Sequence, residues 1–331
     1  MSATVIRRPW ISFQVAVLCL LVTLPYSSQR HVSHLHGQVG EKSDEYVVGL
    51  IASYQDDYET LVASGDFEPI STEKLYGRTF YTGRMHGTKV VYVESGPRRL
   101  NAGVAVHILM DTYKASVIIQ YGTAGSANST LNYGDVNAPE SLAYTGCWEW
   151  LKYKGLVGAS TRPELLFSNY GPENGENRLE GIQFKPEVVF SEEGMESVYS
   201  VKTASFSLLW ESMLQDVKLE NCVGIECAPT TPKVVFGLKG STSDIFVDNA
   251  AYRDFLVKKF KVSTVDQESA AVVMAAKSGA VPVYVFQGVS DLAGGDEDYS
   301  STSLSSLPGA NALKVAVEFI RIMRLRSQWS V

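Results

Sequence analysis

Continuous apolar runs, separated by polar turns, form the framework of this chain. Their positions predict four buried strands, at residues 46–52, 116–120, 233–238 and 281–286. Apolar residues that do not alternate with polar ones are typical of strands covered on both faces of a sheet. Two further stretches have apolar residues at helical spacing and predict amphipathic helices, at 203–217 and 310–325. The pattern predicts one large α/β domain or two small ones.

The region between the first two strands predicts a hairpin and a helix. Strand-forming residues at 79–94 flank His86-Gly87, where the chain is expected to turn. Residues 95–103 then lead into a helix that ends near Tyr113. In contrast, residues 154–196 are rich in Gly, Pro, Asn and Glu and show little periodicity. We expect a long surface excursion there, and not a separate domain.

A helix-start signal precedes the last strand. Thr264 and Gln267 have the spacing of a capping box, so we expect a helix that begins here and carries Glu268 in its first turn. Gly279 ends the apolar segment that follows, as is typical of a helix C-terminus. An acid in the first turn of a helix either complements the helix dipole or binds a ligand.

Glycines and an acid follow two of the predicted strands. The segment Gly122-Thr123-Ala124-Gly125 comes after the strand at 116–120. Glycines at such a place let backbone N–H groups approach an anion or a sugar. Ser290-Asp291 comes just past the strand at 281–286. Because open α/β sheets bind ligands beyond the carboxyl ends of their strands, these two segments are candidates for one site.

The N-terminal segment and the charge narrow the localisation and the partners. Residues 1–28 hold two arginines, an apolar core and small residues, which predicts a secretory signal peptide. A polar tail at 29–44 follows, and the folded domain is expected over 45–327. We therefore expect a secreted or vacuolar protein without stable membrane insertion. The formal net charge of −7 argues against a nucleic-acid partner and suits a protein that takes a small ligand.

The cysteines predict a local disulfide and no metal centre. Cys222 and Cys227 flank a short loop, and in an oxidising compartment we expect them to pair. No second cysteine pair or histidines follow at zinc spacing, so no metal is expected. Asn128-Ser129-Thr130 is a glycosylation sequon close to the glycine segment, where we expect little glycosylation.

The segment from Val265 to Gly295, VDQESAAVVMAAKSGAVPVYVFQGVSDLAGG, resembles the C-terminal signature of the nucleoside phosphorylase and nucleosidase family. Within that family it is similar to the plant branch that includes the bark storage proteins. The resemblance extends over roughly residues 46–325, apart from the excursion. It implies a single domain with a three-layer α/β fold, whose mixed and partly barrel-like central sheet is flanked by helices. It also implies a homo-oligomer.

The resemblance assigns roles to several residues. Glu268, with Gln267 beside it, would hold the ribose hydroxyls, and Asp291 would protonate the leaving purine. Phe246-Val247 would contact the purine, while the segment Gly122-Thr123-Ala124-Gly125 would lie where the ribosyl group meets the nucleophile. Asp57 matches the acid that polarises the nucleophile; alternatively it serves only the helix N-terminus. Arg98 and Arg99 form a weak candidate for a phosphate clamp, and a solvated turn is the alternative.

Two departures from the family pattern are visible. Gln267 stands where relatives usually have Met, and Gln287 stands where they usually have Arg. The preferred function is nevertheless cleavage of the N-glycosidic bond of a purine nucleoside, a methylthioadenosine-like compound or a cytokinin riboside. Hydrolysis and phosphorolysis both remain open, with no cofactor and with inorganic phosphate as a candidate co-substrate. The alternatives are a storage protein that keeps the fold with little catalysis, and a binding module for nucleosides or cytokinins.

Overall fold

The computed structural model describes residues 45–53, 57–150, 182–295 and 306–327. The predicted signal peptide, the tail at 29–44 and most of the predicted excursion lie outside the described residues. No helix in the described part of the chain is long and apolar enough to cross a membrane. The described residues from 45 onward belong to a single compact unit.

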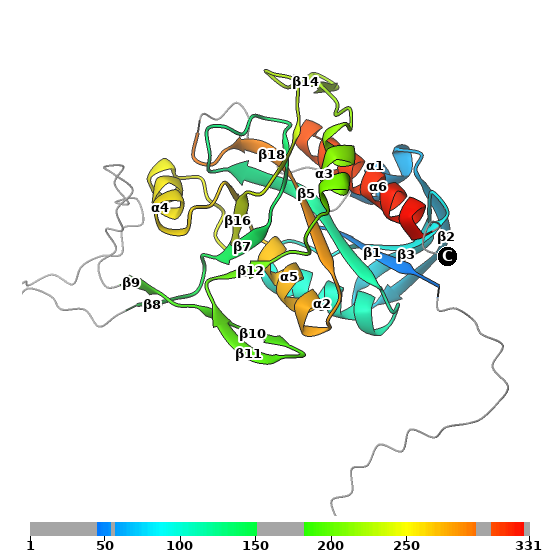
Figure 1. The fold of residues 1–331 in the computed structure, drawn as a ribbon, viewed down its shortest axis with the longest axis horizontal. Helices are drawn as coiled ribbons and strands as arrows, with labels where there is room; N and C mark the ends of the chain where they lie inside the picture. Colours follow the sequence, from blue (N-terminus) through cyan, green and yellow to red (C-terminus); the bar gives the residue numbers. More distant parts are fainter. Residues whose placement is uncertain (1–44, 54–56, 151–181, 296–305, 328–331) are drawn as a thin grey trace, which may run out of the picture. The chain divides into compact units, whose positions relative to one another are not determined.

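A mixed sheet of twelve strands forms the centre of the fold (Figure 1). Its main path has the order β12-β7-β16-β17-β5-β1-β4-β3-β2. The bounds along this path are Ser200–Lys202, Ser141–Tyr144, Lys239–Thr242, Thr264–Asp266, Val117–Ser126, Val47–Ala52, Thr88–Glu94, Arg78–Met85 and Phe67–Leu75. Off this path, β18 (Val283–Leu292) pairs with β5 and β6 (Val136–Ala138), and β15 (Val234–Phe236) pairs with β6. The predicted mixed sheet is confirmed.

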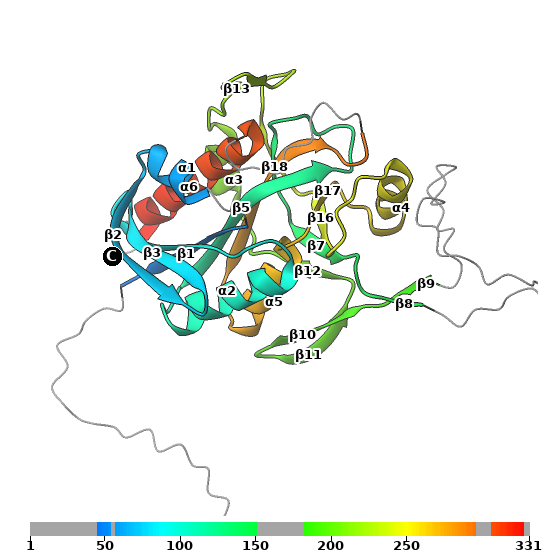
Figure 2. The ribbon, with the colours of Figure 1, turned by 180° about the vertical axis from the view of Figure 1, so that it is seen from behind.

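Helices cover both faces of the sheet, which confirms the three-layer α/β fold. On one face, α2 (Arg99–Asp111) and α5 (Ser269–Ser278) lie side by side, as Figure 2 shows. On the other face, α6 (Leu307–Ser327) packs on β5 and β18, with α3 (Leu208–Gln215) beside it. Two separate clusters of buried apolar side chains fill the space between these layers. The remaining helices are α1 (Asp57–Ala63) and α4 (Ala250–Phe260).

Strands β1, β5 and β18 run parallel, and their apolar runs end side by side. β1 pairs in parallel with β4 and β5, and β18 pairs in parallel with β5. All six residues of β1 are buried, in keeping with its continuous apolar run and the covered faces of a parallel sheet. The strand order therefore gathers the segments that follow three apolar runs at one edge.

The predicted hairpin is confirmed. β3 and β4 pair antiparallel, and Met85 stands opposite Thr88, so that His86 and Gly87 alone form the turn. Both have positive φ, 48° for His86 and 79° for Gly87. This is the backbone of a two-residue turn whose twist matches that of the strands.

Two predicted strands end too early. β5 continues past residue 120 to Ser126, so the glycine segment is part of the strand and not a loop after it. β18 continues past residue 286 to Leu292 and includes Asp291. The reason is tertiary, because the two extensions pair with each other from Phe286 to Leu292. Cross-strand hydrogen bonds thus override the low strand propensity of glycine.

Helix boundaries differ from the prediction in two places. Thr264 does not cap a helix; it begins β17, and α5 starts only at Ser269. The helix expected at 203–217 is shorter, because α3 begins at Leu208 behind the cap Ser207. Leu208 is 85 % exposed, so it does not belong to the apolar side that the pattern indicated.

Part of the predicted excursion has regular structure. The described residues from 182 onward form β9 (Ile182–Phe184), β10 (Glu187–Ser191) and β11 (Gly194–Val198). β9 pairs with β8 (Trp148–Trp150), while β10 and β11 form a hairpin of their own. The short strands lack a long periodic pattern, which is why the sequence did not predict them. Farther along, β13 (Cys222–Val223) and β14 (Glu226–Cys227) form another hairpin, closed by the predicted disulfide between Cys222 and Cys227.

Candidate functional site

A small polar pocket lies where the apolar runs of β1, β5 and β18 end. Strands β5 and β18 contribute Gln120, Gly122, Thr123, Phe286 and Gln287 to its lining, and Ser53, which follows β1, also lines it. The turn from β17 into α5 contributes Asp266, Glu268 and Ser269. The volume is about 10 Å³, which is roughly the space that one water molecule needs. None of the described residues that line the pocket is Lys, Arg or His.

Glu268 is the N-cap residue of α5, yet its carboxylate does not cap the helix. The side chain is buried, with 5 % of the residue exposed. Its Oε1 accepts a hydrogen bond of 2.7 Å from the backbone N–H of Arg98, and its Oε2 accepts one of 3.3 Å from the backbone N–H of Gln267. Burial, followed by the charge of Asp266, raises the pKa of Glu268 to about 7. The carboxyl therefore titrates near neutral pH and has capacity for further donors.

Asp266 performs the capping role that Glu268 does not. Its Oδ1 accepts hydrogen bonds of 3.2 Å from the backbone N–H groups of Glu268 and Ser269. The hydroxyl of Thr242 donates to the same oxygen at 2.6 Å, and the hydroxyl of Ser269 donates to Oδ2. Asp266 thus fixes the turn from β17 into α5 and, with it, the position of Glu268.

Gln287 joins this turn to the sheet through both ends of its amide. Nε2 donates to Oδ2 of Asp266 at 2.6 Å. Oε1 accepts from the hydroxyl of Thr264 at 2.7 Å and from Nδ2 of Asn137 at 3.1 Å. The amide orientation is fixed, because only the NH₂ end can donate to a carboxylate. Gln287 therefore orients Asp266 without neutralising its charge.

Asp291 lies farther along β18, beyond an irregularity in the strand. The register between β18 and β5 shifts between Val289 and Asp291, so that Ser290 is an extra residue and Asp291 stands opposite Gly125. A Cβ atom at Gly125 would come within 3.4 Å of Oδ1 of Asp291, so glycine leaves room for the carboxyl. Such bulges re-aim side chains near functional sites.

Burial and the charge of Asp248 favour the protonated form of Asp291, which can donate a proton. Its pKa is raised, chiefly by burial and further by the charge of Asp248, while a 2.6 Å hydrogen bond from the hydroxyl of Ser290 opposes the rise. A carboxylic acid with a raised pKa keeps its proton closer to neutral pH and can act as a general acid. Asp291 is not among the residues that line the small pocket.

In the glycine segment, some residues line the pocket and another faces Asp291. Gly122 and Thr123 line the pocket, and Gly122 stands opposite Gln287 in the register. Ala124 is buried, and Gly125 faces Asp291. The segment therefore connects the two places at which Glu268 and Asp291 lie.

The two arginines have different surroundings. Arg98 contributes its backbone N–H to Glu268, while the residue is exposed. The guanidinium of Arg99 donates to Oδ2 of Asp244 at 2.8 and 3.1 Å and lies 3.7 Å from Oε2 of Glu187. Arg99 is thus held by two carboxylates. The structure does not bring its guanidinium to the pocket lining, which weakens the predicted phosphate clamp.

The predicted purine-binding residues lie on the segment after β16. Phe246 is 56 % exposed, and Val247 is buried with the residues around α4. On the same segment, the backbone oxygen of Asp244 accepts a 3.0 Å hydrogen bond from Nε2 of Gln267. Gln267 therefore ties this segment to the turn that carries Glu268. Asp57 is the first residue of α1, but its side chain lies outside the described part of the structure.

Sequence reasoning did not single out Ser53, Gln120, Asp266 or Ser269 as site residues. Gln120 is the clearest omission, because a glutamine within an apolar strand, 5 % exposed, is uncommon. Its position in the run at 116–120 was the available signal. Asp266 could have been found from its place two residues before Glu268.

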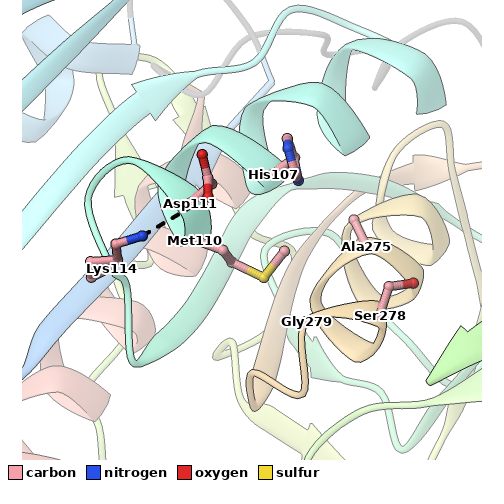
Figure 3. A pocket seen from close by; sticks show the side chains of 7 residues that line it. All are labelled: His107, Met110, Asp111, Lys114, Ala275, Ser278 and Gly279. Carbon is pink, nitrogen blue, oxygen red and sulfur yellow. Dashed lines mark ion pairs between the residues drawn. The ribbon is translucent and has the colours of Figure 1, made fainter. Parts of the chain in front are cut away.

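A second and larger hollow lies at the opposite edge of the sheet. Its volume is about 480 Å³, and Figure 3 shows the residues that line it, on α2 and α5 and just after each helix. Lys114 and Asp111 form an ion pair of 3.9 Å at its rim. The sulfur of Met110 would come within 2.8 Å of a Cβ atom at Gly279, so the ends of the two helices pack closely beside the hollow. Because α2 and α5 end here and lead into the amino ends of β5 and β18, we do not assign it to the site.

Comparisons with known proteins identify the family and the fold. The sequence profile described as Phosphorylase superfamily matches residues 47–322. Bark storage protein A of Populus deltoides is 36 % identical over 280 residues, which are 82 % of this chain and 88 % of that protein. A 5′-methylthioadenosine/S-adenosylhomocysteine nucleosidase of Bacillus subtilis is 30 % identical over 131 residues, which are 38 % of this chain and 56 % of that protein.

Among solved structures, S-adenosylhomocysteine nucleosidase from Streptococcus pyogenes has a similar fold. Its TM-score is 0.58 at 20 % identity, and the match covers 86 % of this chain and 98 % of that chain. The fold, the matched profile and the bark storage relative together confirm the resemblance seen in the sequence. The chain therefore belongs to the phosphorylase superfamily.

Proposed function

We propose that this protein hydrolyses the N-glycosidic bond of a purine nucleoside. The observation that carries the proposal is the charge of the pocket. Two carboxylates, those of Asp266 and Glu268, line it, and none of the described lining residues is cationic. A phosphate ion would face these carboxylates without a compensating charge, which is unfavourable in a buried site. A water molecule is neutral and matches the space.

The proposed chemistry needs one nucleophile and one acid. The oxygen of water forms a bond to C1′ of the ribose as the bond from C1′ to the purine nitrogen breaks. Asp291 gives its proton to the leaving purine, and Asp57 takes a proton from the water. Free ribose and free base result. Proton exchange with solvent then returns Asp291 to the acid form and Asp57 to the carboxylate.

Glu268 is proposed to bind the ribose. Its carboxylate, held by two backbone N–H groups, would accept hydrogen bonds from the sugar hydroxyls. Those bonds strengthen as positive charge develops on the sugar, so they stabilise the transition state more than the substrate. Phe246 and Val247 are proposed to contact the purine, with Gln267 holding their segment against the turn at Glu268.

The related proteins support this reading of the site. The Bacillus subtilis and Streptococcus pyogenes proteins are named nucleosidases, and a further structural neighbour is the futalosine hydrolase of Helicobacter pylori. The last has a TM-score of 0.57 at 17 % identity, and the Streptococcus pyogenes structure is 20 % identical, so both solved structures support the fold alone. The substrate class for this chain remains a purine nucleoside, a methylthioadenosine-like compound or a cytokinin riboside.

The decisive experiment measures release of free base. The protein, without residues 1–28, is incubated with inosine, adenosine, methylthioadenosine and a cytokinin riboside, each with and without inorganic phosphate. Release without phosphate is the expected result. Release only with phosphate would instead establish a phosphorylase and return Arg98 to consideration as an anion ligand.

A second candidate function is storage. The specific observation is the 36 % identity to Bark storage protein A over most of both chains. This alternative is favoured if no nucleoside is cleaved and none raises the melting temperature. A thermal shift without cleavage would instead identify a nucleoside-binding protein. Secretion to the apoplast or vacuole and assembly into a homo-oligomer are proposed for either function.

A further inference from the structure

Gln120 is a buried polar residue whose side-chain oxygen is left without a partner. It lies in the middle of β5, opposite Ile51 of β1 and Val285 of β18. The residue is 5 % exposed, and in the described part of the chain nothing donates a hydrogen bond to its Oε1. A buried carbonyl oxygen without a donor is unfavourable, so such a group calls for a ligand.

The surroundings of Gln120 show where that ligand would be. Gln120 lines the same pocket as Glu268 and Gln287, with Ser53 at the end of the neighbouring strand. The space of about 10 Å³ is roughly what one water molecule needs. Gln287 cannot replace Gln120 as an acceptor, because its Oε1 already accepts from Thr264 and Asn137.

We propose that Gln120 holds the attacking water, which donates a hydrogen bond to Oε1. The inference rests on the proposed hydrolysis and adds a residue that touches the nucleophile. An amide oxygen accepts a hydrogen bond without taking the proton, so Gln120 orients the water while a carboxylate serves as the base. Orientation of the lone pair toward C1′ is what converts a bound water into a nucleophile. The proton balance of the reaction is unchanged.

A sugar hydroxyl could also donate to Oε1 of Gln120, because both water and a hydroxyl donate through an O–H group. Water is favoured by one observation, which is that without any substrate the pocket has space for roughly one water molecule. A resting site that already contains a water needs no substrate to satisfy Gln120.

The test uses Gln120→Met, which keeps the length of the side chain and removes the acceptor. We expect kcat for nucleoside hydrolysis to fall about 10- to 100-fold, because the water is misplaced. KM and the thermal shift caused by bound nucleoside should change less than about threefold, as expected for a group that does not contact the substrate. An unchanged kcat would overturn the proposal.

A matched variant separates this effect from folding. Gln287→Met removes an amide whose two ends are both paired, so it should lower the melting temperature. Gln120→Met should leave the melting temperature near that of the wild type, since no protein partner is lost. A large fall in the melting temperature of Gln120→Met would identify a structural role and overturn the assignment.

Two further experiments identify the group that donates a hydrogen bond to Oε1 of Gln120. With a 2′-deoxynucleoside the defect of Gln120→Met should persist; its disappearance would assign the 2′-hydroxyl as the donor and refute the water. Independently of activity, a high-resolution crystal structure of the ligand-free wild type should show a water about 2.8 Å from Oε1. An absent water there refutes the inference even if hydrolysis is confirmed. If the wild type cleaves nothing, the proposed hydrolysis fails, and Gln120 then has no nucleophile to hold.

Discussion

Gln287 donates from Nε2 to Oδ2 of Asp266 at 2.6 Å, and this contact explains the charge of the site. Gln287 departs from the family pattern, in which an arginine is usual at this position. The structure shows that the amide is fully used. Because an amide carries no charge, Asp266 remains a carboxylate next to Glu268, and its charge adds to the effect of burial on the pKa of Glu268.

Replacing Asp266 should therefore shift the pH dependence of the site. In Asp266→Asn the charge is lost, so the pKa of Glu268 should fall from about 7. The ionised form that accepts ribose hydroxyls would then be present at lower pH. The pH dependence of nucleoside binding, followed by calorimetry, should move its acidic limb downward. An acidic limb at the same pH in wild type and variant would show that the charge of Asp266 does not act on Glu268.

Stability should also depend on the protonation of Glu268. Between pH 4.5 and about 7 the folded protein keeps a proton on Glu268 that the unfolded chain has released. The proton on Glu268 thus adds to the free energy of unfolding below pH 4.5, and this contribution is lost as the pH rises to about 7. Its size is on the order of 3 kcal/mol. Because a neutral amide resembles the protonated carboxyl, denaturant unfolding of wild type and Glu268→Gln should differ least below pH 4.5 and most above about pH 7, where the variant is the more stable. A pH-independent difference would contradict this prediction.

Asp291 should be required for turnover and not for folding. In Asp291→Asn the general acid is lost, so we expect kcat to fall about 10²- to 10⁴-fold while nucleoside binding persists. The raised pKa predicts that wild-type activity declines toward alkaline pH as Asp291 loses its proton. The exposed acid Asp216, at the end of α3, offers a matched control as Asp216→Asn. Equal turnover of the two variants would remove Asp291 from the mechanism.

Two glycines of the paired strands should respond in opposite ways to alanine. A Cβ atom at Gly288 would lie 2.0 Å from the backbone oxygen of Pro308 in α6, so Gly288→Ala should destabilise the fold by about 3 kcal/mol or more. A Cβ atom at Gly122 meets nothing within 4 Å, and this glycine lines the pocket. Gly122→Ala should keep the unfolding midpoint and reduce hydrolysis at least tenfold, since the methyl group enters open space beside the pocket, where the substrate is proposed to lie. Denaturant titration and a base-release assay distinguish these outcomes.

The elements that could be predicted are those whose signal is local. The run at 46–52, the turn at His86-Gly87 and the disulfide pair each carry their own pattern, and each is confirmed. The mixed α/β fold followed from the family resemblance. Thr264 shows the limit of local signals, because its capping-box spacing is satisfied while the residue pairs with Ser126 of β5 as a strand. A distant strand decided the outcome.

The site residues likewise differ in how far the sequence could predict them. Glu268 and Asp291 could be predicted because they resemble a family motif. Asp266 and Gln120 carry only weak local signals, because their roles depend on contacts between segments far apart in sequence. The raised pKa of Glu268 is likewise a product of burial, which no motif encodes.

The contact between Arg98 and Glu268 has a consequence for how this position can vary among related proteins. Arg98 has φ of 75°, a conformation unfavourable for a residue with a Cβ atom, and from it the main-chain N–H reaches the carboxylate at 2.7 Å. Every amino acid except proline supplies that N–H. Position 98 can therefore change its side chain freely, with glycine the least strained choice, and keep its contribution to the site. An alignment of side chains would score such a position as unimportant, and only the exclusion of proline would reveal its role.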